Sequence, residues 1–140
     1  MNVLASSLIA ASAFVILALG LIHLLYTFYG TKLHPRDPQL TAALKEASPL
    51  ISRQTTMWKA WVGFNASHSF GAILFGAIYA YLAILHSAFL FQSAFLLGLG
   101  VLLLGGYAIL GKVYWFSIPF RGALLALLFY IAGLVVICTF

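Results

Sequence analysis

Residues 57–86 read MWKAWVGFNASHSFGAILFGAIYAYLAILH, and this run decides the fold because it is apolar along nearly its whole length. A helix needs about 20 predominantly apolar residues to cross the hydrocarbon core of a bilayer. Lys59, close to the start, is the only lysine, arginine or acidic residue in the run. Similar runs cover residues 3–30, 88–111 and 122–140. The sequence therefore predicts an all-α fold, a polytopic membrane four-helix bundle, with residues 1–140 as a single domain.

The composition supports the same class of protein. Hydrophobic residues make up 64% of the chain and charged residues only 6%, whereas soluble globular domains are roughly 25% charged. The net charge of +5 comes from basic residues that form no stripe with interleaved stacking aromatics, so nucleic acid is not expected as a partner.

The positions of the basic residues predict an orientation in the membrane. Five lie in or beside the first connection and two flank the third: Lys32, Arg36, Lys45, Arg53, Lys59, Lys112 and Arg121. Connections rich in lysine and arginine remain in the cytoplasm. We therefore expect a multi-pass protein with its first and third connections in the cytoplasm and both termini outside.

The first connection is long and predicts a short amphipathic surface helix between helices one and two. Asp37 can cap a helix whose first position is Pro38, and Ser48-Pro49 ends it. Apolar positions recur between these limits at helical spacing, at Leu40, Ala43, Leu44 and Ala47. Ser52 or Thr55 is the expected cap of the next helix. The second connection is nearly absent, which predicts a tight hairpin of helices two and three, and the third has about ten residues.

Small residues predict where helices approach each other closely. Ala72, Gly76 and Ala80 recur every four positions in the second run. The third run and its end carry Gly98, Gly105, Gly106 and Gly111. In lipid, such faces allow close backbone packing, so packing is the interpretation for each of these glycines.

One helical face of the second run is polar, and it is the candidate ligand-binding site. Gln54, Trp58, Trp61, Asn65 and His68 step by three or four residues along it. His68 lies about 16 Å along the helix from Met57. The first run carries a matching face with His23 and Thr27. Because consecutive helices are usually neighbours, we expect the two faces to meet around His23, Asn65 and His68.

Two interpretations of this polar face remain open. Ionisable residues inside a membrane usually face the bundle interior or a cavity, which favours a site. The alternative is that Asn65 and His68 only hydrogen-bond across helices, each bond contributing about 0.6 to 2 kcal/mol. Under the first interpretation, a headgroup at the membrane surface meets Arg36, Lys45 and Arg53.

The residue types restrict the chemistry of such a site. No catalytic residue is assigned, because Asp37 and Glu46 are the only acids and neither can orient a histidine within a membrane run. A catalytic zinc ion needs three protein ligands, and the sequence contains no HExxH or CxxC motif. A metal or haem bound by His23 and His68 remains the alternative. The sequence therefore leans away from an enzyme without deciding the matter.

GLIHLLYTF, GTKLHPRDP and WKAWVGFNASHS together resemble the motifs of an uncharacterised family of small four-helix bacterial membrane proteins. The resemblance covers about residues 20–71. It implies a bacterial inner membrane protein and assigns no activity. The resulting hypothesis is a small membrane subunit or binding module with a cytoplasm-facing pocket for a lipid or other amphipathic ligand, acting with partner membrane subunits or as a homo-oligomer.

Overall fold

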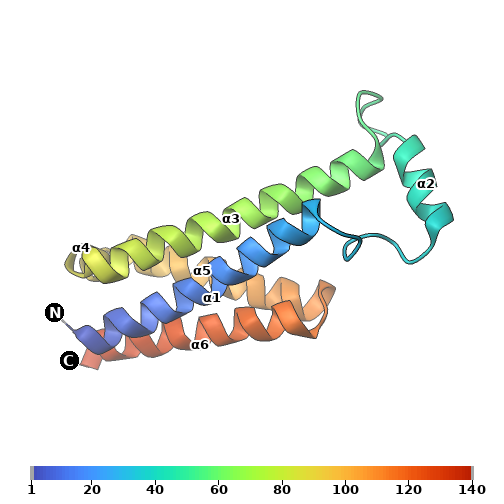
Figure 1. Ribbon diagram of the computed structural model, residues 1–140. Helices are drawn as coiled ribbons and strands as arrows, with labels where there is room; N and C mark the ends of the chain where they lie inside the picture. Colours follow the sequence, from blue (N-terminus) through green and yellow to red (C-terminus); the bar gives the residue numbers. More distant parts are fainter. Residues whose placement is uncertain (1, 140) are drawn as a thin grey trace. The chain divides into compact units, whose positions relative to one another are not determined.

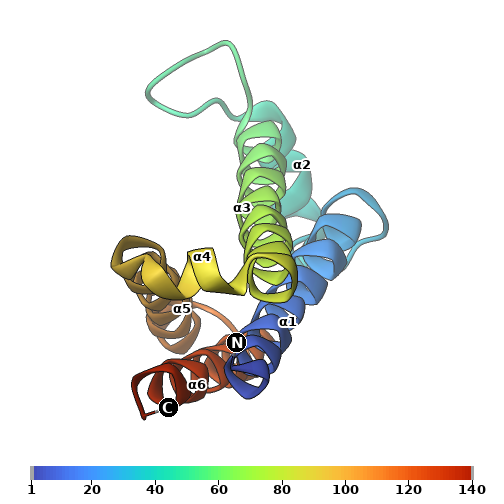
Figure 2. The ribbon, with the colours of Figure 1, turned by 90° about the vertical axis from the view of Figure 1, so that its left-hand side faces the viewer.

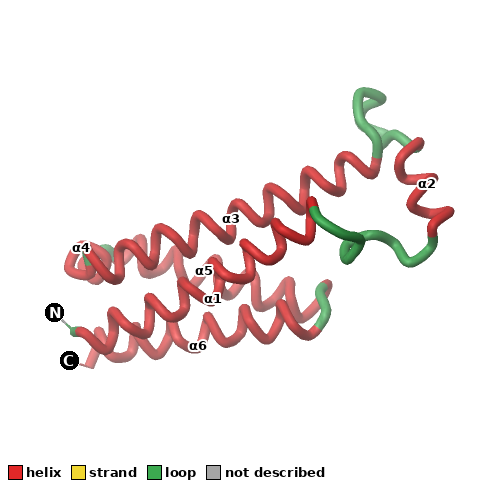
Figure 3. Tube along the Cα trace, in the orientation of Figure 1, coloured by secondary structure: helices red, strands yellow, loops and turns green. Residues whose placement is uncertain are grey.

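The computed structural model describes residues 2–139, and every regular element within them is a helix (Figures 1 and 3). In chain order these are α1 (Val3–Phe28), α2 (Pro38–Glu46), α3 (Met57–Leu85), α4 (Ser87–Gln92), α5 (Ala94–Tyr114) and α6 (Ser117–Thr139). Four of them, α1, α3, α5 and α6, are long and apolar enough to cross a membrane. The prediction of an all-helical chain with four long apolar segments is confirmed. The predicted ends at Met1 and Phe140 lie outside the described residues.

The connections differ from the prediction at two places. The second connection is not a tight turn, because α4 forms a separate short helix between α3 and α5. The break before α5 falls at Ser93, whose side-chain oxygen accepts a hydrogen bond from the Leu96 N–H and caps the helix. The third connection consists only of Trp115 and Phe116, because α6 already begins at Ser117. Pro119 fits in the first turn of α6, where a missing N–H removes no helical hydrogen bond.

The chain divides into two compact units, and α1 and α3 contribute residues to both. The first unit contains the chain up to Leu19 and from Ala72 onward. Its core is a cluster of aliphatic and aromatic side chains from five helices, among them Ile9, Tyr79, Leu90, Leu104 and Tyr130. The second unit is Gly20–Gly71.

Hydrogen bonds between helices fix the packing of the first unit. The buried Ser12 hydroxyl of α1 donates to the Ala126 carbonyl of α6 at 2.7 Å. Tyr79 of α3 donates to the Leu96 carbonyl at 2.6 Å, and Tyr130 of α6 donates to the next carbonyl of α5, that of Leu97, at 3.1 Å. Figure 2 shows α5 and α6 as neighbouring helices within this unit. Two tyrosines from different helices therefore bind consecutive carbonyls at the start of α5.

The glycines divide into packed and open positions. A Cβ atom on Gly76 would lie 2.7 Å from the Ala13 carbonyl oxygen, and one on Gly111 would lie 3.1 Å from the Phe120 Cα. The packing interpretation is confirmed for these two glycines. It is wrong within the described chain for Gly98, Gly105 and Gly106, because a Cβ at each would have no neighbour within 4 Å.

Candidate functional site

The second unit contains every residue of the predicted site, and its surface helix forms as expected. The Asp37 carboxylate accepts a hydrogen bond from the Gln39 N–H at 2.8 Å, and Pro38 occupies the first turn of α2. The helix ends at Glu46, just before Ser48-Pro49. None of its residues is buried, and Leu40 is 49% exposed. The apolar side of α2 is therefore only partly covered by the rest of this unit, through the half-buried Leu44.

The two predicted polar faces meet at a polar cluster of His23, Asn65 and His68. His23 Nε2 lies 3.0 Å from Asn65 Oδ1. The Asn65 amide nitrogen donates to the Trp61 carbonyl at 2.8 Å, so Oδ1 is the accepting end and His23 carries a proton on Nε2. The His68 ring packs edge-on against the His23 ring, with 5.5 Å between ring centroids. The expectation that these three residues come together is confirmed, whereas a binding role for them stays a prediction.

Thr27 lies one turn after His23 on the predicted face of α1, whereas Gln54 lies outside the predicted face of α3. The Thr27 hydroxyl donates to the His23 carbonyl one turn earlier in α1, at 2.8 Å. Gln54 is exposed and precedes the helix, because α3 begins only at Met57. The prediction that Gln54 shares the helical face is therefore wrong.

Gln54 lies outside the helical face because α3 begins after it. Thr56 caps the helix, since its hydroxyl accepts a hydrogen bond from the Lys59 N–H at 3.3 Å. Ser52 instead accepts from the Gln54 N–H at 3.1 Å, which holds the preceding loop. The sequence predicts Ser52 or Thr55 as the cap of this helix, and this prediction is wrong, because the capping residue is Thr56, next to Thr55.

Trp58 and Trp61 line an apolar hollow. Gly30, with a φ of 84°, ends α1 in a conformation that glycine adopts without strain, and the chain after it returns to α3. There the Trp61 indole N–H donates to the Leu33 carbonyl at 3.2 Å. The resulting hollow of ≈ 330 Å³ is lined by Leu33, His34, Pro35, Leu44, Trp58 and Trp61. Four of these six residues come from connection one or α2.

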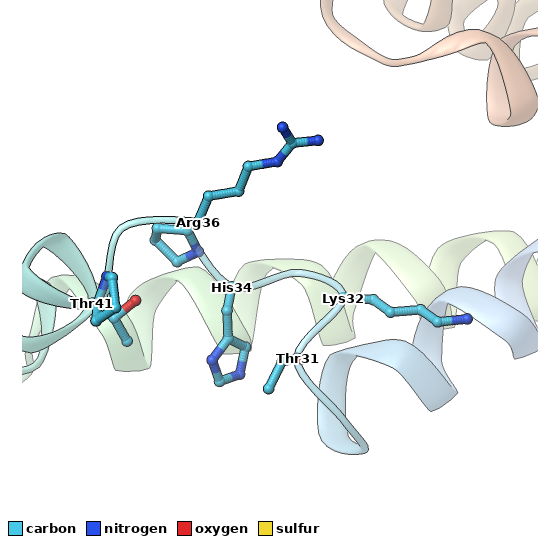
Figure 4. A pocket seen from close by; sticks show the side chains of 7 residues that line it. Thr31, Lys32, His34, Arg36 and Thr41 are labelled. Carbon is cyan, nitrogen blue, oxygen red and sulfur yellow. The ribbon is translucent and has the colours of Figure 1, made fainter.

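A second, cationic hollow adjoins the first and shares His34 and Pro35 with it. Its volume is ≈ 590 Å³, and its lining is Thr31, Lys32, His34, Pro35, Arg36, Pro38 and Thr41. Figure 4 shows Lys32 and Arg36 extending away from the chain in different directions. The Lys32 ammonium lies 3.9 Å from the centroid of the Tyr26 ring. None of these lining residues is acidic, so the described part of the hollow is positively charged.

His34 is the main residue that the sequence pattern did not identify. Its ring lies edge-on to Trp58 with 4.6 Å between centroids, and it lines both hollows. The sequence feature that points to His34 is Gly30, which allows the chain to reverse after α1, followed by His34 directly before Pro35, whose ring restricts the backbone. Lys45, predicted at the headgroup level, has its ammonium 5.8 Å from the Trp58 ring centroid. Arg53 is exposed in the loop between α2 and α3.

The polar cluster does not match the geometry of a cofactor site. Within residues 2–139, no group of three histidine, cysteine or acidic side chains is placed to hold a metal ion. A haem held by two histidines lies between their rings, whereas His23 and His68 pack directly edge to face. His23 Nε2 is also engaged by Asn65. The residues of the cluster therefore fit neither a three-ligand zinc ion nor a bis-histidine haem in this arrangement.

Comparison with known proteins identified no matching family model, curated protein or solved structure.

Proposed function

We propose that this chain is a four-helix bundle of the bacterial inner membrane that binds an anionic lipid, or another anionic amphiphile, at its cytoplasmic surface. The membrane assignment is supported by the four long apolar helices. Each of them also exposes large apolar side chains of the kind that lipid solvates, for example Phe14, Leu74, Leu102 and Leu128. The orientation, with both termini outside, follows from the basic residues around connections one and three.

The observation that supports the ligand class is the pair of adjoining hollows. One is lined mainly by Leu33, Leu44 and two tryptophans, and the other contains Lys32 and Arg36 without an acidic residue in its described lining. An amphiphile whose anionic headgroup lies near the cations can place its apolar part against the tryptophans. Tryptophan at the membrane surface suits this use, because its ring prefers the headgroup level.

The polar cluster supports the hollow from within the helices. Asn65 binds the Trp61 carbonyl and is held by His23 of the neighbouring helix. Trp61 in turn holds connection one through the Leu33 carbonyl. These contacts join His23 of α1 to the part of α3 that carries Trp61, and we propose that the cluster stabilises this part of the site.

We also propose that this chain acts in an assembly with a partner subunit or a second copy. Gly98, Gly105 and Gly106 of α5 have no neighbour within 4 Å of a Cβ position, and small residues on a membrane helix allow another helix to approach closely. A partner subunit or a second copy is thus part of the proposed function.

Lipid binding can be tested by native mass spectrometry of the purified chain with phosphatidylglycerol or phosphatidylcholine. A basic residue near an anionic lipid surface contributes about 1 kcal/mol. Lys32→Gln combined with Arg36→Gln is therefore expected to weaken phosphatidylglycerol binding roughly thirtyfold. Phosphatidylcholine, which carries no net charge, should bind more weakly to the unchanged chain.

The matched control is Lys112→Gln combined with Arg121→Gln, which removes the same charge from residues that line neither hollow. This pair is expected to bind phosphatidylglycerol as the unchanged chain does. Equal weakening by both pairs would show that net charge alone attracts the lipid, and the proposed site would then be abandoned.

A further inference from the structure

The loop between α2 and α3, residues 48–56, is a finger with a closed base. The Met57 N–H, at the first residue of α3, donates to the Ala47 carbonyl at the end of α2, and this 2.8 Å bond joins the two ends of the loop. Inside the finger, the Ser52 N–H donates to the Pro49 carbonyl at 3.2 Å, and the Ser52 hydroxyl accepts from the Gln54 N–H. The finger is therefore a locally ordered structure.

The tip of the finger carries two large aliphatic side chains in full exposure. Leu50 is 110% exposed and Ile51 is 94% exposed, whereas Leu40 on the apolar side of α2 is 49% exposed. Removing a leucine or isoleucine side chain from water contributes about 1.5 to 3 kcal/mol. Two such residues next to each other on an ordered loop therefore form a strong apolar contact surface. Neither of them lines either hollow.

The position of the finger relative to α3 indicates what covers this tip. Figures 1 and 2 both show the loop projecting sideways from the start of α3, on the side away from α1. Trp58 lies in the first turn of the same helix, and tryptophan marks the level of the membrane surface. A loop that leaves a membrane-crossing helix sideways at this level extends along the bilayer surface.

The charges around the finger agree with an anionic lipid surface. Arg53 lies within the finger and Lys59 follows it in the first turn of α3. Residues 48–56 include no acidic side chain. Basic residues beside an exposed apolar pair are the combination by which peripheral segments bind membranes containing anionic lipids.

We propose that the tip of the finger, Leu50 and Ile51, inserts into the lipid surface of the membrane that α3 crosses. The inserted tip fixes the end of α2 against the bilayer and keeps connection one at the level of lipid headgroups. This contact is separate from the proposed lipid site, since it uses different residues and needs no ligand in either hollow.

A spin label at position 51 can test the insertion by electron paramagnetic resonance. Ile51→Cys is made in a Cys138→Ala background, because Cys138 is exposed and would also react. The labelled full chain is reconstituted in vesicles of phosphatidylethanolamine and phosphatidylglycerol, and its accessibility to oxygen and to a water-soluble nickel chelate is compared. Oxygen concentrates in lipid and the nickel chelate in water. The logarithm of the ratio of oxygen to nickel accessibility should therefore be positive at position 51.

Ala42→Cys is the matched control, because Ala42 is exposed on α2 opposite its apolar side. The same logarithm should be negative there, and Leu50→Cys should repeat the result of position 51. A negative value at both tip positions would place the finger in water and overturn the proposal. Protection of both tip positions from oxygen as well as nickel would indicate cover by a protein, and it would overturn the proposal equally.

Discussion

The bond between His23 and Asn65 allows a quantitative test of the polar cluster. Asn65 is 7% exposed, and its side chain joins His23 of α1 to the Trp61 carbonyl of α3. Asn65→Leu keeps the side-chain size but leaves the His23 Nε2 proton without its acceptor. His23→Leu removes the donor, and the double variant removes both groups. Each single variant should lower the free energy of unfolding, and the double variant should lower it by less than the sum.

The size of this non-additivity follows from measured bonds of the same kind. Hydrogen bonds between membrane helices contribute about 0.6 kcal/mol on average and up to about 1.7 kcal/mol. The coupling energy of the cycle should lie in that interval, equivalent to a roughly three- to eighteenfold change in the unfolding equilibrium constant. Reversible unfolding of the full chain in mixed detergent and lipid micelles measures the four free energies.

The control cycle pairs His23→Leu with Ser67→Ala. The Ser67 hydroxyl donates only within α3, to the Phe64 carbonyl, so its effect should add to that of His23→Leu within about 0.5 kcal/mol. A coupling energy between His23 and Asn65 no larger than this control value would refute the argument that the bond joins the two helices.

Two further predictions concern packing and orientation. Gly76→Ala should lower the free energy of unfolding by about 1 to 3 kcal/mol, because its Cβ would lie 2.7 Å from a backbone oxygen of α1. In the monomeric chain, Gly105→Ala should raise this free energy by about 0.5 to 1 kcal/mol, because its Cβ would lie in open space. The same unfolding assay tests both, and equal effects would contradict the packing argument. A membrane-impermeant thiol reagent applied to intact cells should label the native Cys138. The same reagent should not label Lys45→Cys in a Cys138→Ala background. The reverse labelling pattern would show that the protein has the opposite orientation.

The parts of the fold that could be predicted are those fixed by local chemistry. Four apolar segments follow from length and hydropathy, and the start of α2 follows from Asp37 before Pro38. The break at Ser93 depends on a single hydroxyl that competes for a backbone N–H. Many serines in membrane helices do not break them, so periodicity and hydropathy give no signal for this cap.

The candidate site was predictable where helical spacing and the pairing of neighbouring helices determine which residues meet. The spacing from Trp58 to His68 placed these side chains on one face, and the pairing of neighbouring helices brought His23 to them. The role of His34 depends on the path of an irregular loop after Gly30, which helical spacing does not describe. The loop closes on α3 through one tertiary hydrogen bond, from the Trp61 indole to the Leu33 carbonyl.

This bond extends the proposed role of the polar cluster beyond linking two helices. If Asn65 were only a link between helices, its contact with the Trp61 carbonyl would be incidental. Trp61, however, binds the Leu33 carbonyl of connection one, and connection one supplies both cations of the cationic hollow. Under the proposed function, we expect a change at His23 to affect the start of α3 that carries Trp61, although His23 lines neither hollow. In the proposed function, ligand binding and helix linkage would depend on the same group of residues.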